Sequence, residues 1–255
     1  MAGTAEERRE KISEIIRKEG SVRVRELSRL FEVSEVTIRS DLENLEAQGQ
    51  CRRNHGGAVG LEKLYIDMDI TERYMSNSAQ KKAIADAVSN LVEDNDTLLL
   101  NAGTTLTYVL RAIRGKKNIS IITNSIANAT EAASYPNMSV ILLGGQIDSK
   151  YQFTYGADSI SQLRRYHTLK SILSVDGIDP VSGLTLYYSN EAELVRTMIE
   201  NSDTVIVAAD SSKLGRSTFA KVAPVTSADI IVTNNTDNSE LISKLESIGI
   251  EVINV

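Results

Sequence analysis

Apolar residues in the first sixty positions recur at the spacing of short amphipathic helices. In the charged segment 6–19, three isoleucines share one helical face, and Gly20 follows as a stop signal. A second helix is predicted over 25–31, with Leu27, Leu30 and Phe31 buried. The chain is therefore predicted to begin with two short helices that pack through their apolar faces.

A third helix is predicted to begin after Ser34, which is a favourable N-cap residue. Its buried stripe would be Ile38, Leu42 and Leu45. Two short extended pieces follow around the basic residues 52–55, with a turn at Gly56-Gly57, and would form a wing. Two helices joined by a short turn, the second polar on its outer half, describe a helix-turn-helix.

In such a motif the outer residues of the second helix face the major groove of DNA. These residues are polar here: Ser34, Glu35, Thr37, Arg39 and Ser40. Arg39 can donate two hydrogen bonds to guanine or to phosphate. The wing would place further cations along phosphates or in the minor groove: Arg52, Arg53 and His55. Periodicity alone also allows a small three-helix bundle whose arginines are simply solvated.

Beyond residue 78 short continuous apolar runs alternate with helical stretches. The runs are 97–100, 119–122, 139–143, 172–175, 204–207 and 229–232, and 251–253 closes the chain. This alternation predicts a largely parallel α/β sheet with helices on both faces. Residues 61–78 show no strong periodicity, so they are predicted to link an N-terminal domain (1–60) to a C-terminal domain (79–255).

Ligands of such sheets bind beyond the carboxyl ends of the strands, where four polar loops are predicted to lie. The first, Asn101-Ala102-Gly103-Thr104-Thr105, opens a helix and offers N–H groups and hydroxyls to an anion. The others are Thr123-Asn124-Ser125, Gly144-Gly145-Gln146 and the segment 175–179 with Asp176-Gly177. Each loop alone is ordinary turn chemistry, but four at one edge predict a shared cleft.

Composition narrows the class of protein. The chain has 255 residues, 42% hydrophobic and 24% charged, which is typical of a soluble globular protein. No apolar run approaches the ~20 residues of a membrane helix, and no secretory signal is visible, so we expect a cytoplasmic protein without a membrane partner. One cysteine, Cys51, and two histidines exclude an internal disulfide and a typical zinc cluster, but they leave an all-carboxylate metal site open. No metal or cofactor is expected.

The net charge of −6 would disfavour nucleic acid if it were evenly spread. The first sixty residues, however, carry eleven basic and eleven acidic side chains, so the excess negative charge lies in the C-terminal part. A local basic face on the neutral N-terminal domain can therefore still bind phosphates.

The run 33–42 (VSEVTIRSDL), with Leu45 and the later RNHGGA at 53–58, resembles the winged helix-turn-helix of the DeoR family of bacterial transcriptional regulators. The two signatures also have the separation found in that family. Ser40 and Asn54 stand where the family most often has a basic residue and a threonine. The resemblance implies that the N-terminal domain binds double-stranded operator DNA.

The C-terminal part resembles the sensor domain of the same family, which is related to ribose-5-phosphate isomerase. The matching motifs are Tyr155-Gly156, Val175-Asp176-Gly177, 189–193, 209–215 and Val222-Ala223-Pro224. The resemblance implies a phosphate at Gly103-Thr104-Thr105 and a charge-neutralising role for Lys213. It also implies a set of sugar-lining residues: Thr123, Asn124, Gly144, Asp176 and Glu191. Asn101 replaces a residue that is commonly acidic in the family, so the polarity of that edge of the cleft differs.

We therefore expect a repressor of a carbohydrate-catabolism operon. It would act as a homo-oligomer, a dimer or a tetramer, and a phosphorylated sugar would release it from DNA. The alternative is a sugar-phosphate isomerase or deaminase-like enzyme with Asp176, Asp179, Glu191 and Lys213 as acid–base groups. Against the enzyme stand Pro180, where such isomerases have a glutamate, and the DNA-binding head. A protein-interaction adaptor would leave the cleft chemistry unexplained.

Overall fold

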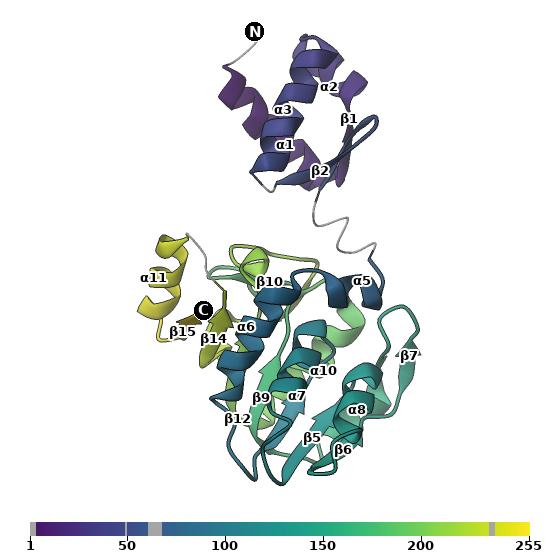
Figure 1. The fold of residues 1–255 in the computed structure, drawn as a ribbon, viewed down its shortest axis with the longest axis vertical. Helices are drawn as coiled ribbons and strands as arrows, with labels where there is room; N and C mark the ends of the chain where they lie inside the picture. The colour runs from purple at the N-terminus through teal and green to yellow at the C-terminus, as the bar shows by residue number, and fades with distance from the viewer. Residues whose placement is uncertain (1–3, 49, 61–67, 235–237) are drawn as a thin grey trace. The chain divides into compact units, whose positions relative to one another are not determined.

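The computed structural model describes residues 4–48, 50–60, 68–234 and 238–255. The chain divides into two compact units, Met1–Met68 and Asp69–Val255, each with its own core (Figure 1). This boundary falls within the segment 61–78 that was predicted to be a linker, and residues 61–67 of that segment lie outside the described residues.

The N-terminal unit, called the head below, is a winged helix-turn-helix. Its helices are α1 (Ala5–Glu19), α2 (Val24–Phe31) and α3 (Glu35–Ala47). Its strands β1 (Ser21–Arg23), β2 (Cys51–Asn54) and β3 (Gly57–Gly60) form an antiparallel sheet in the order β1-β3-β2. Gly20 ends α1 in the left-handed conformation, and the Ser34 hydroxyl accepts a hydrogen bond from the Thr37 N–H to begin α3.

The core of the head joins all three helices to the wing. It is formed by Ile12, Ile16, Val22, Val24, Leu27, Ile38, Leu42, Leu45, Cys51 and Ala58. The prediction that Leu30 is buried is wrong, because its side chain is 64% exposed. On this two-turn helix Val24, Leu27 and Phe31 share the inner face, and Leu30 is rotated away from it.

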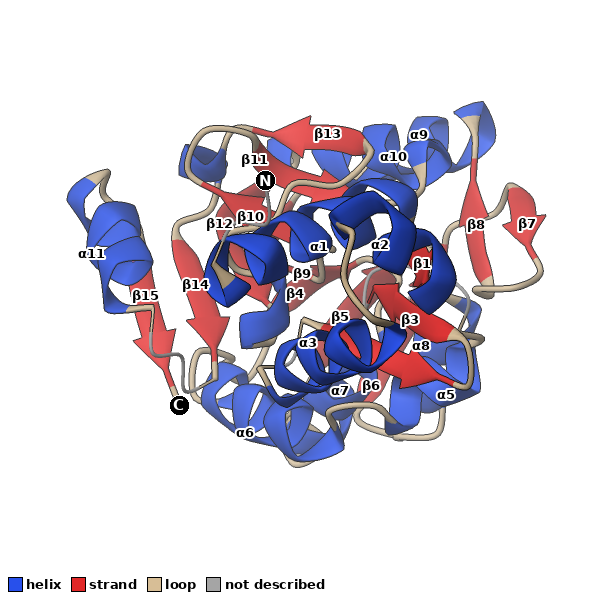
Figure 2. Cartoon of the chain, turned by 90° about the horizontal axis from the view of Figure 1, so that it is seen from above, coloured by secondary structure: helices blue, strands red, loops and turns tan. Residues whose placement is uncertain are grey.

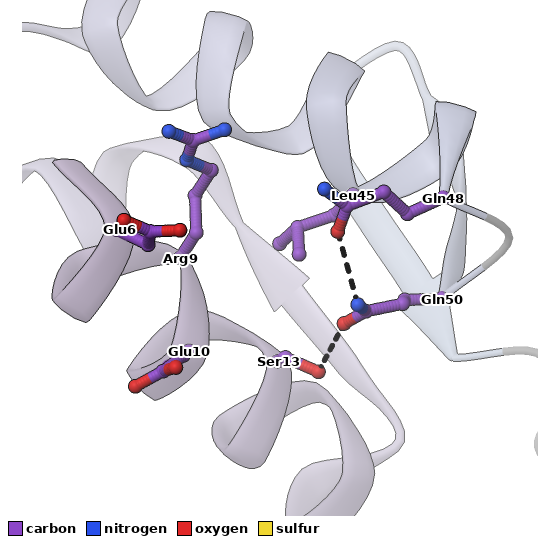
Figure 3. A pocket seen from close by; sticks show the side chains of 7 residues that line it. All are labelled: Glu6, Arg9, Glu10, Ser13, Leu45, Gln48 and Gln50. Atoms are coloured by element: carbon purple, nitrogen blue, oxygen red, sulfur yellow. Dashed lines mark hydrogen bonds between the residues drawn. The ribbon is translucent and has the colours of Figure 1, made fainter.

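A polar cavity of about 250 Å³ lies between α1 and the segment after α3 (Figure 3). Ser13 Oγ donates to Gln50 Oε1 at 2.6 Å, and Gln50 Nε2 donates to Gln48 Oε1 at 3.0 Å. The full lining is Glu6, Arg9, Glu10, Ser13, Leu45, Gln48 and Gln50. Since none of the residues predicted to contact DNA lines this cavity, the candidate DNA surface lies elsewhere on the head.

The C-terminal unit, called the sensor below, contains a seven-stranded sheet in which every pair is parallel. Its strands are β4 (Thr97–Leu100), β5 (Ile119–Thr123), β6 (Met138–Leu142), β9 (Thr168–Leu173), β12 (Ser202–Ala208), β14 (Ile230–Thr233) and β15 (Glu251–Asn254). Their order is β15-β14-β12-β9-β4-β5-β6. All seven predicted apolar runs contribute to this sheet, which confirms the parallel α/β fold.

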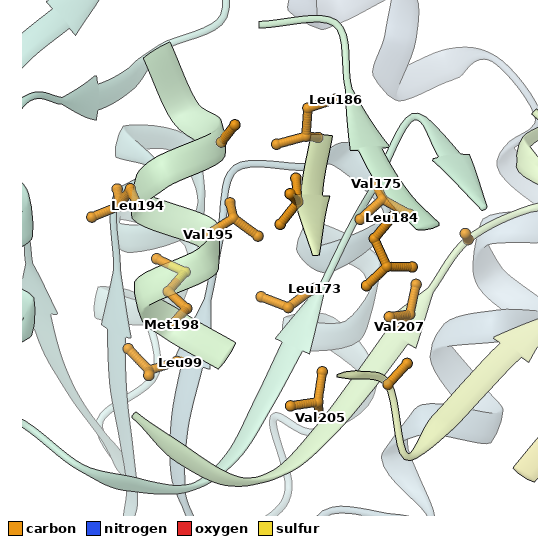
Figure 4. Close-up of a cluster of buried hydrophobic side chains, with 14 of the residues drawn as sticks. Leu99, Leu173, Val175, Leu184, Leu186, Leu194, Val195, Met198, Val205 and Val207 are labelled. Carbon is orange, nitrogen blue, oxygen red and sulfur yellow. The ribbon is translucent and has the colours of Figure 1, made fainter. Parts of the chain in front are cut away.

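Helices cover both faces of the sheet (Figure 2). Leu98 and Leu100 of β4 pack with α6 (Ser78–Ser89), α7 (Thr104–Ala112) and α8 (Ile126–Ala133). Leu99 points the other way into a core shared with α9 (Ala157–Leu163), α10 (Ser189–Glu200) and α11 (Ser239–Ser247) (Figure 4). Burial on both faces explains why the strands are continuously apolar.

Short strands follow the main strands at positions where only loops were expected. β7 (Gln146–Asp148) and β8 (Phe153–Tyr155) form a hairpin. β10 (Gly177–Asp179), β11 (Gly183–Leu186) and β13 (Ala220–Ala223) form a small antiparallel sheet. The 3₁₀ turns η1 (Ser211–Lys213) and η2 (Val225–Ser227) lie near it in sequence. No helix among the described residues is long and apolar enough to cross a membrane.

Residues 70–78, assigned to the linker by the sequence prediction, belong instead to the sensor. They form helix α5 (Ile70–Met75) and the start of α6. Asp69 and Glu72 cap α5 reciprocally, and the Arg73 side chain is buried. A helix of six residues leaves little periodic signal, which is why the pattern did not reveal it.

A charged pair fastens α1 to α3 in the head. Arg8 Nε donates to Asp41 Oδ2 at 2.6 Å and Arg8 Nη2 to Oδ1 at 3.2 Å, and both side chains are largely buried. Hydrogen bonding to Asp41 raises the pKa of Arg8. This two-point contact fixes the rotation of α3, and with it the face that α3 turns outward.

Replacing Arg8 by alanine would leave the buried Asp41 carboxylate without its main partner. We expect the head to lose about 2 kcal/mol of unfolding free energy. Arg23→Ala is the matched control, because the Arg23 side chain is 82% exposed and lies 4.0 Å from Glu26, so the loss should stay below about 0.5 kcal/mol. Native-state hydrogen exchange of the α3 amides measures both values. Equal losses would show that the Arg8–Asp41 pair does not stabilise the head.

Candidate DNA-binding surface and effector site

The residues predicted to face the major groove lie on the outer side of α3. Ser34, Arg39 and Ser40 are exposed, and Glu35 and Thr37 are partly exposed. The hydroxyls of Ser34 and Thr37 are hydrogen bonded to each other at 2.8 Å. The helix buries Ile38, Asp41, Leu42 and Leu45 on its opposite side. The pattern of exposure therefore agrees with a recognition helix.

Glu35 organises two arginines on this surface. Arg39 Nη2 lies 2.9 Å from Glu35 Oε2, one helical turn away, and Arg25 Nε lies 3.6 Å from Glu35 Oε1. Arg25 lies in the first turn of α2 and was not in the predicted DNA-binding set. A DNA phosphate or guanine would compete with Glu35 for these guanidinium groups.

In the wing, Arg53 and Asn54 are held by contacts within the head, whereas Arg52 and His55 are exposed. Arg53 lies 2.5 Å from Glu43, and its N–H donates to Glu46 Oε1 at 2.8 Å, so Arg53 connects β2 to α3. Asn54 Oδ1 accepts from the Gly56 N–H, which closes the hairpin turn. Arg52 and His55 are exposed on β2 and in the turn. Asn54 therefore has a local structural use at the position where the family more often has threonine.

Val36 adds an apolar group that sequence reasoning missed. It lies in the first turn of α3, beside Glu35 and Thr37, and 71% of it is exposed. Exposed apolar side chains on recognition helices can contact the methyl group of thymine. The sequence signal that could have revealed Val36 is its position outside the predicted buried stripe of α3.

In the sensor, the strand order reverses between β4 and β9, which is where ligands of such sheets bind. Asn101, after β4, bridges this gap with its side-chain amide. Its Oδ1 accepts from the Ser174 N–H at 2.8 Å, and its Nδ2 donates to the Ser174 carbonyl at 3.0 Å. Gly103 completes the close approach, because a Cβ there would lie 2.4 Å from Ser174 Cβ.

Glu191, near the start of α10, draws two loops together. Its Oε1 accepts from the Ala102 N–H at 3.1 Å, from Asn101 Nδ2 at 3.3 Å and from Asn124 Nδ2 at 3.4 Å. Burial raises the pKa of Glu191 to about 7, although the donors from Ala102 and Asn124 oppose that shift. Glu191 therefore positions the loops that follow β4 and β5.

The amide at position 101 suits this environment better than a carboxylate would. Asn101 donates to Ser174 and Glu191 and also accepts from Ser174, whereas an ionised aspartate can only accept. An aspartate here would also place a second negative charge against Glu191. The departure of Asn101 from the family pattern is thus accounted for by its neighbours.

Asn124 leaves one buried acceptor unused. Its Nδ2 also donates to the Thr154 carbonyl at 3.1 Å, but its Oδ1 has no hydrogen-bond partner among the described residues. Unpaired buried acceptors are costly, and a ligand hydroxyl would satisfy this one.

Among the described residues of the sensor three cationic side chains are buried, and only Lys213 of these was predicted to lie in the site. Arg73 of α5, Lys81 of α6 and Lys213 of η1 are each at most 7% exposed. Burial lowers the pKa of Lys81 to about 8; Asp210 opposes the shift, and Lys213 and Arg73 add to it. Burial also lowers the pKa of Lys213, with Asp176 and Asp210 opposing. Arg73 and Lys81 escaped sequence reasoning because isolated charged residues usually lie on the surface.

The Thr104 end of α7 opens onto a cavity of about 330 Å³ between α5, α7 and α8. Thr104 Oγ1 donates to the Arg73 carbonyl at 3.5 Å, so this loop contacts α5 directly. The full lining of the cavity is Ile70, Thr71, Tyr74, Gly103, Thr104, Thr107, Arg111, Ser125, Ala127, Asn128, Glu131 and Gln152. Gly103 caps α7 without a side-chain hydrogen bond.

The remaining predicted residues make contacts that shape the loops. Thr123 Oγ1 accepts from the Ser125 N–H, and the Gly144 N–H donates to Gln162 of α9. A Cβ at Gly145 would lie 2.2 Å from Ser159 Oγ. One at Gly177 would lie 2.6 Å from the Arg216 carbonyl. Thr105 is buried at the start of α7. Asp176 Oδ2 accepts from the Tyr187 N–H at 3.0 Å.

Of the acid–base set of the alternative enzyme, Asp176 interacts electrostatically with both Glu191 and Lys213, whereas Asp179 is engaged elsewhere. Asp179 Oδ1 accepts from the N–H groups of Val181 and Ser182 and so closes the turn between β10 and β11. Glu191 is occupied by loop amides. Within the described part of the chain, no three His, Cys, Asp or Glu side chains are placed to hold a metal ion.

The raised pKa of Glu191 predicts a pH dependence of sensor stability. The pKa is about 7 in the folded protein and about 4.5 in the unfolded chain, so the unfolding free energy should decrease as pH rises from 4.5 to 7. Glu191→Gln removes this ionisation and should be more stable than the parent at pH 8 by roughly 1–3 kcal/mol, but nearly equal at pH 5.

Urea unfolding at several pH values measures this difference. Glu193→Gln is the control on the same helix, because Glu193 is exposed. Parallel stability curves for the parent and Glu191→Gln would contradict the assignment of a buried ionisation to Glu191.

Comparison with known proteins gives the same two parts. Residues 8–63 match the family model of the DeoR-like helix-turn-helix domain, and residues 76–235 match that of the DeoR C-terminal sensor domain. The chain is 35% identical over 246 residues to the HTH-type transcriptional regulator YulB of Bacillus subtilis, covering 96% of this chain and 95% of that protein. It is 32% identical over 233 residues to the transcriptional repressor AccR of Agrobacterium fabrum, covering 91% and 90%.

Among solved structures, a ribose 5-phosphate isomerase from Plasmodium falciparum matches 52% of each chain with 23% identity and a TM-score of 0.39. Both family models and the curated relatives identify a DNA-binding regulator and not an enzyme. The chain therefore belongs to the DeoR family of helix-turn-helix transcriptional regulators.

Proposed function

We propose that this regulator is a repressor of a carbohydrate-catabolism operon and that a phosphorylated sugar, bound in the sensor, releases it from DNA. The observation that carries the proposal is the burial of Arg73, Lys81 and Lys213 in one unit. Burial lowers the pKa of both lysines, and a bound anion would oppose this shift by stabilising their ammonium forms. Relatives named as repressors, such as AccR, support the direction of regulation.

The sugar class rests on the neutral polar groups near these cations. The unused Asn124 Oδ1 and the Thr104 hydroxyl can both hydrogen bond to sugar hydroxyls or phosphate oxygens. Thr104 also lines a cavity of about 330 Å³, which is in the size range of small-molecule sites but is not lined by the three cations or by Asn124. No metal or other cofactor is part of the proposal.

Oligomerisation completes the proposed mechanism. A single head is neutral overall, and helix-turn-helix proteins gain affinity by placing two recognition helices on successive half-sites. We propose a dimer or a tetramer. Ligand binding would favour a subunit arrangement in which the spacing between the heads does not match the spacing of the DNA half-sites. The ligand can shift that balance only by its difference in affinity for the two arrangements. Operator binding requires access to the chromosome, so we propose that the protein acts in the cytoplasm.

Arg39→Ala tests the DNA-binding surface. The substitution removes an outer guanidinium group of α3 and should weaken specific binding by about 10- to 100-fold, equivalent to roughly 1–3 kcal/mol. Mobility shifts on a duplex selected by the parent protein from a random-sequence library give the affinities. The control is Arg114→Ala, which removes the same charge from an exposed position in the sensor. Similar losses of DNA affinity in both variants would contradict the assignment of Arg39 to the DNA-binding surface.

Lys213→Met tests the anion site, with inorganic sulfate as a probe that does not titrate near neutrality. Calorimetry should show sulfate binding that weakens at least tenfold in Lys213→Met and stays unchanged in Lys221→Met, whose lysine is exposed on β13. Above pH 8 affinity should fall, because Lys81 must take up a proton before it can attract the anion. Sulfate affinity that is independent of both pH and Lys213 would refute the site.

A further inference from the structure

Helix α5 is the first element of the sensor after the connection to the head. It begins at Ile70, two residues beyond Met68, the last residue of the N-terminal unit. A six-residue helix is too short to be stable alone in water, so its conformation depends on the groups that contact it. Those groups include residues of the candidate effector site.

The side chain of Arg73 anchors one side of α5. Its guanidinium carbon lies 4.3 Å from the ring centroid of Tyr151 and 5.8 Å from that of Tyr188. Arg73 Nη2 also donates to the Tyr188 hydroxyl at 3.2 Å. Tyr188 is the residue that caps α10, three positions before Glu191. The anchor therefore connects α5 to the helix that carries Glu191.

The C-terminal carbonyls of α5 contact two further residues of the proposed site. Lys81 Nζ donates to the carbonyls of Arg73 and Ser76, the latter at 2.8 Å. Thr104 Oγ1 donates to the same Arg73 carbonyl at 3.5 Å. These carbonyls need external donors because they lie in the last turn of a helix. Lys81 and Thr104 thus hold α5 with the groups that would bind an anion.

Tyr74 fixes the opposite side of α5 to α7. Its ring stacks on Tyr108 with centroids 4.8 Å apart, and its carbonyl accepts from the Tyr108 hydroxyl at 3.2 Å. Arg111 donates to the Tyr74 hydroxyl and pairs with Glu131 of α8. Consequently α5 is clamped between the charged groups on one side and α7 on the other.

We propose that α5 is the element through which the sensor transmits ligand binding to the DNA-binding head, an inference that rests on the proposed effector function. An anionic oxygen is a stronger acceptor than a peptide carbonyl, so a bound phosphate draws the Lys81 ammonium and the Thr104 hydroxyl away from Arg73 and Ser76. Helix α5 then loses its donors from Lys81 and Thr104, keeps those from the Ser76 and Tyr108 hydroxyls, and loosens, which changes where the connection to the head begins.

The coupling is reciprocal. A ligand that loosens α5 binds less tightly when DNA holds the heads in the arrangement that requires an ordered α5. The strength of the effect equals the difference in ligand affinity between the two states of α5. No contact between ligand and head is needed.

Hydrogen exchange of residues 69–77 tests the proposal directly in the full chain. The probes are glucose 6-phosphate, fructose 6-phosphate, ribose 5-phosphate and inorganic sulfate, with binding measured independently by calorimetry. A probe that weakens DNA binding should accelerate exchange of the Arg73 and Ser76 amides at least tenfold and leave the amides of α11 unchanged. These amides donate to Asp69 and Glu72 within α5. Weakened DNA binding with unchanged exchange in α5 would overturn the proposal.

An insertion separates transmission from binding. Two glycines placed between Met68 and Asp69 leave α5 and the binding residues intact but lengthen the connection. We expect probe affinity within threefold of the parent and at least a tenfold loss of the probe's effect on DNA affinity. The same insertion after Gly115, in the turn before β5, is the control. Full retention of the probe's effect in the Met68–Asp69 insertion refutes transmission through α5. If no probe binds, the effector function itself fails, and the coupling fails with it.

Discussion

Burying several cations in one domain constrains the architecture of the sensor. A charged group removed from water is tolerated only where opposite charges, aromatic faces or carbonyl dipoles replace its hydration. Arg73, Lys81 and Lys213 obtain these from separate elements: Tyr151 and Tyr188, the end of α5, and the carboxylates Asp176 and Asp210. The arrangement therefore depends on tertiary contacts throughout the unit, and a change in any one partner alters the others.

The polar loops at the switch in strand order obey a related constraint. Glu191 gathers three N–H donors, and Asn101 satisfies the backbone of Ser174 with both ends of its amide. This hydrogen bonding leaves little freedom in the loops after β4, β5 and β9. The rigidity of that edge contrasts with α5, whose helical turn is supported by side chains of other segments. A rigidly hydrogen-bonded sheet edge beside a helix that depends on other segments is a suitable arrangement for a regulator whose ligand is proposed to bind at that edge.

Most of the fold follows from local patterns, whereas the site follows only in part. Runs such as 97–100 predict buried parallel strands, because a strand that is buried on both faces has apolar residues at consecutive positions. The recognition helix is equally local, with Ser34 as cap and Ile38, Leu42 and Leu45 as core. Helix α5 and the burial of Arg73 and Lys81 were not predictable in this way, because they depend on groups more than a hundred residues away, such as Tyr188 for Arg73 and Asp210 for Lys81. Leu30 shows the same limit on a smaller scale, since hydrophobicity alone does not fix which way a short helix turns.

The strand order has a consequence for a chain synthesised from its N-terminus. The core of the head closes within residues 12–58, so the head can fold soon after it leaves the ribosome. Strand β4, by contrast, needs β9 (Thr168–Leu173) as a neighbour, and β14 needs β15 (Glu251–Asn254). Such non-local parallel pairing is slow compared with the folding of local helices. We therefore expect an interval during the synthesis of each molecule in which the DNA-binding head is already folded but the sensor is not.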